Sequence, residues 1–535
     1  MRTLTLTVPA RFVAIALAAA LAFAALVATI AYTVADSRSG AALAQAAGAT
    51  QPVLASAQNP LGIASTSYRA ATEKAAEGKP KVVVVATGGT LAGKATGRDT
   101  YTSYRAGTYL MDDLLDTLRP EIDAIADVSA VQFGNAGSSG YSIAQFHALT
   151  AEVEKQLETA DAVVVTTGTD TQEEFAYWLD LTVQSRKPVI TSGAMRPWGS
   201  GDTPAEDALF GSDGPANLYS SILLAASQQT FCFGTVLMLN DEIQAAREVT
   251  KSNSYRNDTF QSREYGVLGW IDGPNITLGR APARVLACDT DEWFTPFDLD
   301  EIAASDLPRV EILMSYQQAG GEAVTAFAGA GVEGIVTAGT GAGGISSAMG
   351  QARTAAIRDH GVWFVTTTRT GSGSSYSAGN GVISGGDLTA VKARLLLLLS
   401  RAFTDDLDTA RGWFASVGSP TFDQSEAAAT TDPGPGAPDP VLFTGAAATT
   451  CIAKKPRVTL SVANTDTAPV DVTVTSPAGD HSFRTLAPGA STKHAFTLRD
   501  PELAAGEATF TATKIVDGQP IETVSTAAYP AITCP

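Results

Sequence analysis

The sequence predicts an α/β protein, with two lobes built on parallel sheet, followed by a small all-β sandwich of the immunoglobulin-like kind. Three observations indicate this. Between residues 81 and 415, valine-rich segments alternate with helical patterns, which is typical of a parallel sheet covered on both faces. Residues 416–440 break that pattern with a dense run of proline and glycine, which predicts a linker. From residue 441 to 535, short segments alternate apolar and polar residues, with turn signals between them.

The first lobe, residues 81–290, begins with four consecutive valines at 82–85, and a second valine strand follows at 163–165. Helical periodicity predicts helices at 111–118, 143–157, 173–183 and 217–226. A further strand is predicted at 234–239. The second lobe, residues 291–415, has predicted strands at 310–314, 334–336 and 362–367 and a long apolar helix at 388–403. In the sandwich, the clearest strands are 457–462, 470–474, 493–498 and 508–512.

Polar side chains directly follow two of the valine strands. Residues 168–171, Gly-Thr-Asp-Thr, come after the strand 163–165, and Thr90 follows the strand 82–85 between glycines. Ligands of open α/β sheets bind at the carboxyl ends of the strands, so we expect the two turns to share one pocket. The alternative is that the oxygen-bearing side chains only cap a helix. A phosphate-binding loop is less favoured, because the Lys-Ser/Thr of a P-loop is missing.

Five short motifs follow one another in an order that resembles the bacterial L-asparaginase family, the threonine amidohydrolases. They are Thr-Gly-Gly-Thr at 87–90, Tyr-Arg-Ala-Gly at 104–107, Thr-Gly-Thr-Asp-Thr at 167–171, Gly-Ala-Met-Arg-Pro at 193–197 and Val-Thr-Lys at 249–251. Each alone is a common kind of turn, but the joint match is specific. The resemblance covers about residues 80–415 and implies the family's two-lobed fold and amide hydrolysis without a cofactor. It does not extend to the sandwich.

The resemblance also implies roles for five residues. Thr90 matches the family's nucleophile, and Tyr104 matches the tyrosine that acts beside it. Thr169, Asp170 and Lys251 match a second triad, in which the lysine relays protons. Hydrolysis of an amide through a hydroxyl needs a nucleophile of this kind and a group that accepts its proton. Taken alone, Lys251 would more often be a surface lysine, and Tyr104 a partly buried aromatic residue.

Substrate contacts are implied for three residues. Ser138 matches the serine that holds the substrate's α-carboxylate, and Ser139 stands beside it, where many family members have a larger polar residue. Asp170 would hold the α-ammonium group, because a desolvated cation needs a carboxylate partner. The segments 369–380 and 341–344 lack the acid and the asparagine that the family takes from a neighbouring subunit, and Thr167 stands where a histidine is often found.

We therefore predict an exported amidohydrolase that converts L-asparagine to L-aspartate and ammonia through a threonine acyl-enzyme. Hydrolysis of glutamine or of another side-chain amide is one alternative. A non-catalytic cell-surface binding protein that keeps the fold, with the sandwich as its adhesive part, is the other. Following the family, we expect a homo-oligomer, a tetramer built from pairs of subunits. Residues 198–212 form a longer connection than we expect for the family, suited to an entrance or an oligomer contact.

The amino-terminal segment predicts the compartment. Two arginines precede an apolar run at 12–35, and small-residue sites follow it, so residues 1–44 resemble an export signal and residues 45–80 a linker. We favour a cleaved signal, whereas a membrane anchor, and with it an association with membrane or cell surface, is the alternative. Either arrangement sends the rest of the chain out of the cytoplasm.

Charge and cysteine content limit the partners. A net charge of −19, from 55 acidic and 36 basic residues, argues against a nucleic-acid partner, since phosphate binding requires clustered basic residues. Four histidines and four cysteines without zinc-like spacing argue against a metal site. In an exported chain, Cys451 and Cys534, at the two ends of the sandwich, are expected to form a disulfide. The pairing of Cys232 and Cys288 is left open.

Overall fold

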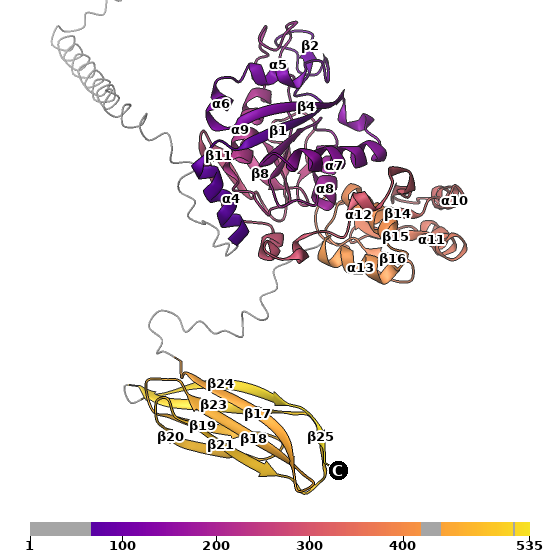
Figure 1. Cartoon of the computed structure of the whole chain (residues 1–535). Helices are drawn as coiled ribbons and strands as arrows, with labels where there is room; N and C mark the ends of the chain where they lie inside the picture. Colours follow the sequence, from indigo (N-terminus) through magenta and orange to yellow (C-terminus); the bar gives the residue numbers. More distant parts are fainter. Residues whose placement is uncertain (1–65, 419–439, 517–518, 535) are drawn as a thin grey trace, which may run out of the picture. The chain divides into compact units, whose positions relative to one another are not determined.

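The computed structural model describes residues 66–418, 440–516 and 519–534. These residues form two compact units, one before the proline-rich segment and one after it (Figure 1). The predicted export segment 1–44, most of the predicted linker 45–80 and nearly all of the predicted linker 416–440 lie outside the described residues. No described helix has both the length and the hydropathy that crossing a membrane requires.

The first lobe is built on an eight-stranded sheet whose central part is parallel. The strand order is β12-β11-β8-β7-β6-β5-β1-β4, and the strands from β7 to β4 run parallel, which confirms the predicted sheet. Strands β8, β11 and β12 extend it in antiparallel fashion, which the sequence pattern did not indicate. The strands are β1 (Lys81–Gly88), β4 (Asp127–Ala136), β5 (Ala162–Thr166), β6 (Val189–Ser192), β7 (Thr235–Leu239), β8 (Glu242–Ala245), β11 (Gly269–Asp272) and β12 (Asn275–Leu278).

Helices cover both faces of this sheet (Figure 1). Successive side chains of a strand point to opposite faces, so Val82 and Val84 pack in one core and Val83 and Val85 in another. The first core is completed by helices α5 (Met111–Asp116), α6 (Glu121–Ile125) and α9 (Gly214–Ser227), and the second by α7 (Ile143–Leu157) and α8 (Gln172–Thr182). Four consecutive valines therefore serve two cores at once, as the sequence predicted.

The second lobe carries a smaller, fully parallel sheet in the order β13-β14-β15-β16. Its strands are β13 (Val310–Met314), β14 (Gly334–Gly339), β15 (Trp363–Thr368) and β16 (Val382–Ser384), and its helices are α10 (Glu322–Gly329), α11 (Ser347–His360), α12 (Ala390–Phe403) and α13 (Leu407–Ser416). Helix α12 packs against both this sheet and α8, so its leucines belong to the same core as Val83 and Val85. Short 3-10 turns connect the lobes: η2 (Ala283–Ala287), η3 (Asp291–Trp293), η4 (Leu299–Glu301) and η5 (Ala304–Asp306).

Part of the predicted linker 45–80 is helical, and that prediction is wrong for residues 66–77. Helix α4 (Thr66–Glu77) packs against α9, with Tyr68 and Ala75 buried, and Lys74 forms an ion pair with Asp161. The segment is rich in alanine, a strong helix former whose small side chain gives little apolar periodicity. The alanine-rich composition therefore gave too little apolar periodicity for this helix to be predicted.

The carboxyl-terminal unit is a two-sheet β-sandwich. One sheet has the order β17-β18-β21 and the other β20-β19-β23-β24, and one apolar core lies between them, with Val458, Leu460, Val472 and Phe510 fully buried. Strand β20 pairs with β19, where a constant-type immunoglobulin domain would place it beside β21. The strands are β17 (Phe443–Ile452), β18 (Lys455–Asn464), β19 (Val470–Thr475), β20 (His481–Leu486), β21 (Ser491–Thr497), β22 (Glu502–Leu503), β23 (Gly506–Val516), β24 (Gln519–Tyr529) and β25 (Ile532–Thr533).

Two disulfides are formed. Cys451 and Cys534 are joined, with their Cα atoms 5.6 Å apart, which confirms the bridge expected across the sandwich. Cys232 and Cys288, whose pairing the sequence left open, are also joined, with a Cα separation of 5.6 Å. The second bridge ties the segment just before β7 to the residue that follows the turn η2, within the first lobe's core.

Candidate active site

The two threonine-bearing turns meet at the carboxyl end of the parallel sheet. Strands β1 and β5 are parallel neighbours, so the turns that follow them lie side by side. Gly89 has a φ of +80°, and a Cβ atom there would lie 2.3 Å from the backbone nitrogen of Gly168. Only a glycine allows this approach. The sequence prediction that Thr90 and Thr169 flank one site agrees with this arrangement.

Thr90 is paired with Tyr104. The Thr90 Oγ1 atom lies 2.8 Å from the Tyr104 hydroxyl oxygen, and the Thr90 side chain is buried. Tyr104 sits on the short strand β3 (Tyr104–Arg105), which pairs with β2 (Lys94–Ala95) to form a small ribbon beyond the sheet. Gly93 at the base of that ribbon would bring a Cβ atom to 3.1 Å from the tyrosine ring. The ribbon therefore folds the tyrosine back onto the threonine fourteen residues earlier.

Lys251 joins Thr169 to Asp170. Its Nζ donates hydrogen bonds to Thr169 Oγ1 at 3.0 Å and to Asp170 Oδ1 at 2.7 Å. The lysine sits on strand β9 (Thr250–Lys251), which pairs with β10 (Phe260–Gln261). The Lys251 side chain is 13% exposed, whereas the Asp170 side chain is 76% exposed. A nearly buried ammonium group therefore meets a carboxylate that still faces solvent and can contact a ligand.

Two further charged residues form hydrogen bonds with the segment that carries Lys251, and the sequence did not predict a role for either. The Lys251 backbone N–H donates to Glu173 Oε1 at 3.4 Å, and Lys392 Nζ on α12 donates to the backbone carbonyls of Val249 and, at 2.9 Å, of Arg247. Burial lowers the pKa of Lys392 to about 8. The available signal was a lysine just before a run of five leucines, Leu395 to Leu399, in a predicted apolar helix, where a lysine is unusual because lysine is rarely fully buried.

The two serines lie at the same turn but differ in exposure. Ser138, in the 3-10 turn η1 (Ser138–Gly140), is buried, and its Oγ accepts a hydrogen bond from the backbone N–H of Thr171 at 3.2 Å. A Cβ atom on Gly168 would lie 3.0 Å from this Oγ. Ser139 is exposed beside it. The structure thus brings Ser138 directly against the Thr169 turn and leaves Ser139 at its edge.

The arrangement suits acyl transfer. Two threonine hydroxyls lie on adjoining turns, one against a phenol and the other against a lysine, so each has a partner for proton exchange. An exposed carboxylate and a buried serine hydroxyl lie next to the second threonine, where they can orient a charged substrate. Among the described residues, no three His, Cys, Asp or Glu side chains gather as a metal site requires.

Family comparisons match the same part of the chain. The model of the asparaginase N-terminal domain matches residues 81–284, and that of the glutaminase/asparaginase C-terminal domain matches residues 309–414. L-asparaginase 2 of Bacillus subtilis is 36% identical over 341 residues, which cover 63% of this chain and 86% of that protein. L-asparaginase 2 of Escherichia coli is 34% identical over 333 residues, covering 61% and 90% of the two chains.

Two more relatives widen the comparison. The glutaminase-asparaginase of Acinetobacter glutaminasificans is 30% identical over 344 residues, covering 63% of this chain and 99% of that protein. The crystal structure of the probable cytoplasmic L-asparaginase from Campylobacter jejuni has a TM-score of 0.58 and 33% identity, and it covers 63% of this chain and 99% of that one. Because both family domains match in order and the relatives align over most of their length, this chain belongs to the asparaginase family and is an amidohydrolase.

Proposed function

We propose that the protein hydrolyses the side-chain amide of L-asparagine to L-aspartate and ammonia, through an acyl-enzyme formed on Thr90. The contact between the hydroxyls of Thr90 and Tyr104 at 2.8 Å, beside the turn where Lys251 meets Thr169, carries this proposal. The alternative of a non-catalytic binding protein gains no support from the site, because binding alone does not require a nearly buried lysine held against a threonine hydroxyl.

The chemistry divides into two steps. Thr90 Oγ1 attacks the amide carbon while its proton passes to the Tyr104 oxygen, and the Tyr104 hydroxyl gives up its own proton, which reaches the amide nitrogen as the carbon–nitrogen bond breaks and ammonia leaves. Water then attacks the resulting ester, releases the acid and restores the Thr90 hydroxyl. Thr169 and Lys251 relay the proton that reaches the leaving nitrogen in the first step and the proton that the attacking water returns to Thr90 Oγ1 in the second.

The recognition of a free amino acid rests on charge. Asp170 presents a carboxylate that is open to solvent on one side and fixed by Lys251 on the other, which suits a substrate α-ammonium group. Ser138 accepts a hydrogen bond from the protein and keeps its O–H free to donate to a substrate α-carboxylate, with the exposed Ser139 at the rim. Glutamine stays the second candidate, because one relative is named a glutaminase-asparaginase.

Ammonia release from asparagine, glutamine and their α-N-acetyl forms tests this proposal on the purified full chain. We expect the highest kcat/KM for asparagine, and a loss of at least ~10-fold for α-N-acetyl-asparagine, because blocking the amine removes the substrate cation that would meet the open side of the Asp170 carboxylate. Asp170→Asn should reduce the difference between free and blocked asparagine. Equal rates for free and blocked forms would contradict the role of Asp170, and no ammonia from any of the four would contradict the proposed reaction.

We also propose that the enzyme acts outside the cytoplasm as a homo-oligomer. Two disulfides support an oxidising compartment, where such bonds persist. Large apolar side chains stay exposed near the carboxyl edge of the second sheet, with Met314 58%, Tyr316 56% and Tyr376 81% exposed, which supports a contact with another copy. Light scattering that finds a fully active monomer would contradict the assembly, and recovery of the chain only from the cytoplasm would contradict export.

A further inference from the structure

The long connection of residues 198–212, here called the strap, lies along the segment that links Thr90 to Tyr104. Residues 91–108, which contain that segment, Tyr104 and the four residues after it, are here called the threonine loop. The Trp198 backbone N–H donates to the Gly93 carbonyl at 3.1 Å, and the Ala95 N–H donates to the Gly199 carbonyl at 2.8 Å. Lys94 and Gly199 form a parallel bridge, so the strap adds a third line of backbone to the ribbon that carries Tyr104.

The strap also holds the far end of the threonine loop. Gly199 and Ala208 pair in antiparallel fashion, so residues 200–207 form a hairpin. Arg98 Nε donates to the Ala208 carbonyl at 3.0 Å, and the Phe210 N–H donates back to the Arg98 carbonyl at 2.9 Å. The guanidinium carbon of Arg98 also lies 4.8 Å from the centre of the Phe210 ring.

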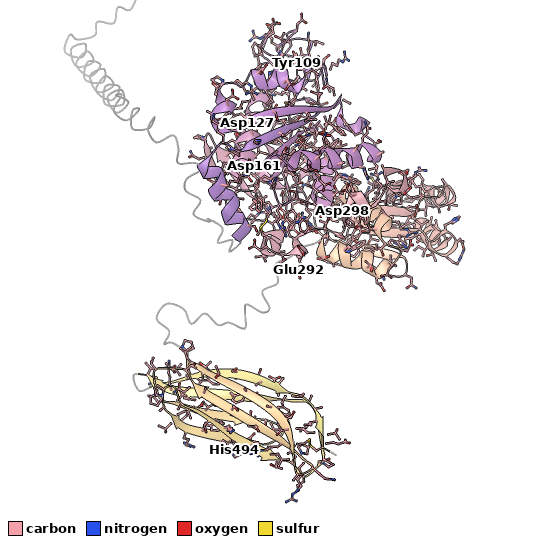
Figure 2. The ribbon with its side chains drawn as sticks, in the orientation of Figure 1. Tyr109, Asp127, Asp161, Glu292, Asp298 and His494 are labelled. Carbon is pink, nitrogen blue, oxygen red and sulfur yellow. A yellow bond between two sulfur atoms is a disulfide. The ribbon has the colours of Figure 1, made fainter. Side chains whose placement is uncertain are left out.

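Tyr109, immediately after the threonine loop, ties the loop to the hairpin. Its ring is buried and its hydroxyl donates to the Gly201 carbonyl at 2.8 Å. Figure 2 shows Tyr109 at the end of the α/β unit where Figure 1 shows β2 and α5. The strap has an anchor of its own, because Trp198 is buried and its Nε1 donates to the Pro204 carbonyl at 3.2 Å. The hairpin is thus held to the rest of the strap by Trp198 and to the threonine loop by Tyr109.

We propose that the strap is a positioning element that keeps the threonine loop closed in the absence of substrate, so that Tyr104 rests against Thr90 before substrate arrives. The proposal rests on the proposed function of Thr90 and Tyr104. A reacting group that is already in place does not have to be ordered during each binding event. The exposed ion pair between Lys94 and Asp202 contributes little by comparison, because such pairs are screened by solvent. The hold therefore comes from the backbone contacts and from Tyr109.

Two variants of the full chain test the strap. Tyr109→Phe keeps the ring and removes its hydrogen bond to Gly201, and should raise the hydrogen-exchange rate of residues 91–108 in the substrate-free enzyme by about five- to tenfold. Replacing residues 201–206 by Asn-Gly closes the hairpin as a two-residue turn between Ser200 and Asp207, whose backbones already pair. This replacement removes the Tyr109 acceptor and the Trp198 acceptor together. Thr203→Ala is the matched control, because its exposed hydroxyl makes no hydrogen bond within the described residues.

Kinetics separate positioning from a general loss of structure. With the hairpin replaced, the loop should be mostly open, so KM should rise at least ~10-fold while kcat at saturating substrate stays within about twofold. A merely structural defect would lower the active fraction and leave KM unchanged. Unchanged exchange in both variants, or an unchanged KM when the loop exchanges freely, would overturn the proposal. An unaltered enzyme without amidase activity would instead contradict the proposed function, and the exchange rates would still decide whether the strap orders the loop.

Discussion

Within the described residues, each unit of the protein buries one lysine, and the two lysines have different surroundings. Lys392, on α12 of the α/β unit, is 1% exposed and donates to the backbone carbonyls of Arg247 and Val249. Lys514, on β23 of the sandwich, is 7% exposed and donates to Asp466 Oδ2 at 2.8 Å and to the Pro440 carbonyl. Desolvation lowers the pKa of Lys392 to about 8, whereas the hydrogen bond from Lys514 holds the pKa of Asp466 well below its ordinary value.

The difference lies in what meets the buried cation, which is a carboxylate in the sandwich and backbone carbonyls in the α/β unit. In the sandwich the buried Lys514 ammonium is neutralised by direct contact with the Asp466 carboxylate. Asp466 also accepts hydrogen bonds from the backbone N–H groups of Leu442 and Ala468. In the α/β unit the buried Lys392 ammonium donates to backbone carbonyls just before Lys251, while the Asp170 carboxylate stays open to solvent. Polar groups that can still form hydrogen bonds or ion pairs with a ligand thus lie at the carboxyl edge of the parallel sheet.

The largest expected effect is the loss of a threonine hydroxyl. Thr90→Ala or Thr169→Val should lower kcat by at least ~10², the scale of removing a positioned catalytic group, and leave the unfolding of both units unchanged. Thr90→Ser, which retains an Oγ atom, is the matched control and should keep much of the activity. Steady-state ammonia release measures the effect, and near-normal turnover in either purified variant would refute the assigned roles.

The next largest effect is expected on the unfolding free energy of the sandwich. Asp466→Ala leaves the Lys514 ammonium buried without its carboxylate and should destabilise the sandwich by about 3–5 kcal/mol, while kcat stays unchanged. Asp480→Ala removes an exposed carboxylate of the same unit and should have almost no effect. Denaturant unfolding of the sandwich measures both. If Asp466→Ala lowered kcat instead, the division between the two units would not hold.

Removing the disulfide of the sandwich should also lower the stability of that unit. Replacing Cys451 and Cys534 by alanine opens a loop spanning 83 residues and should cost roughly 4 kcal/mol in the chain-entropy model, with measured values often smaller. Amidase activity should not change. Replacing Cys232 and Cys288 should instead lower the unfolding temperature of the α/β unit. Calorimetry resolves the two transitions, and a loss of activity on removing the Cys451–Cys534 bridge would be evidence against this assignment.

A smaller effect depends on pH. The pKa of Lys392 is about 8 in the folded chain and ~10.4 in the unfolded chain, so between these values the unfolded chain binds more protons. Stability from this group is therefore present above pH ~10.4 and is lost as pH falls through 8. Relative to Lys392→Met, the native protein should gain ~3 kcal/mol of unfolding free energy between pH 7 and pH 10.5. Unfolding free energies that change with pH in the same way in the native protein and in Lys392→Met would contradict a desolvated lysine at this position.

Local patterns predicted much of this molecule. The helix Ile143–Leu157 and the strand Val310–Met314 were predicted to the residue, because each has clear periodicity and clear ends. The turns bearing Thr90 and Thr169 were found because glycines and hydroxyls follow the valine strands directly. The site motifs were located through the family resemblance, and the geometry of their contacts agrees with it.

Features that depend on distant contacts were not predicted. Strand β17 was missed because its alternating alanine, threonine and glycine residues carry little apolar signal. Glu173 and Lys392 act through the backbone around Lys251, which lies far from both in the sequence. The strap's contacts with residues 93–98 likewise appear only once the chain is folded. Periodicity reports which side of an element is buried, and it does not report which elements meet.

We predict that the α/β unit alone performs amide hydrolysis and that the sandwich serves another purpose. The most direct test is a chain ending near Asp432, assayed for ammonia release from asparagine beside the full chain and beside the same truncation carrying Thr90→Ala. We predict that the truncated chain folds and keeps the kcat/KM of the full chain within about twofold, and that Thr90→Ala lowers kcat in it by at least ~10². A truncated chain that folds but releases no ammonia would contradict the claim.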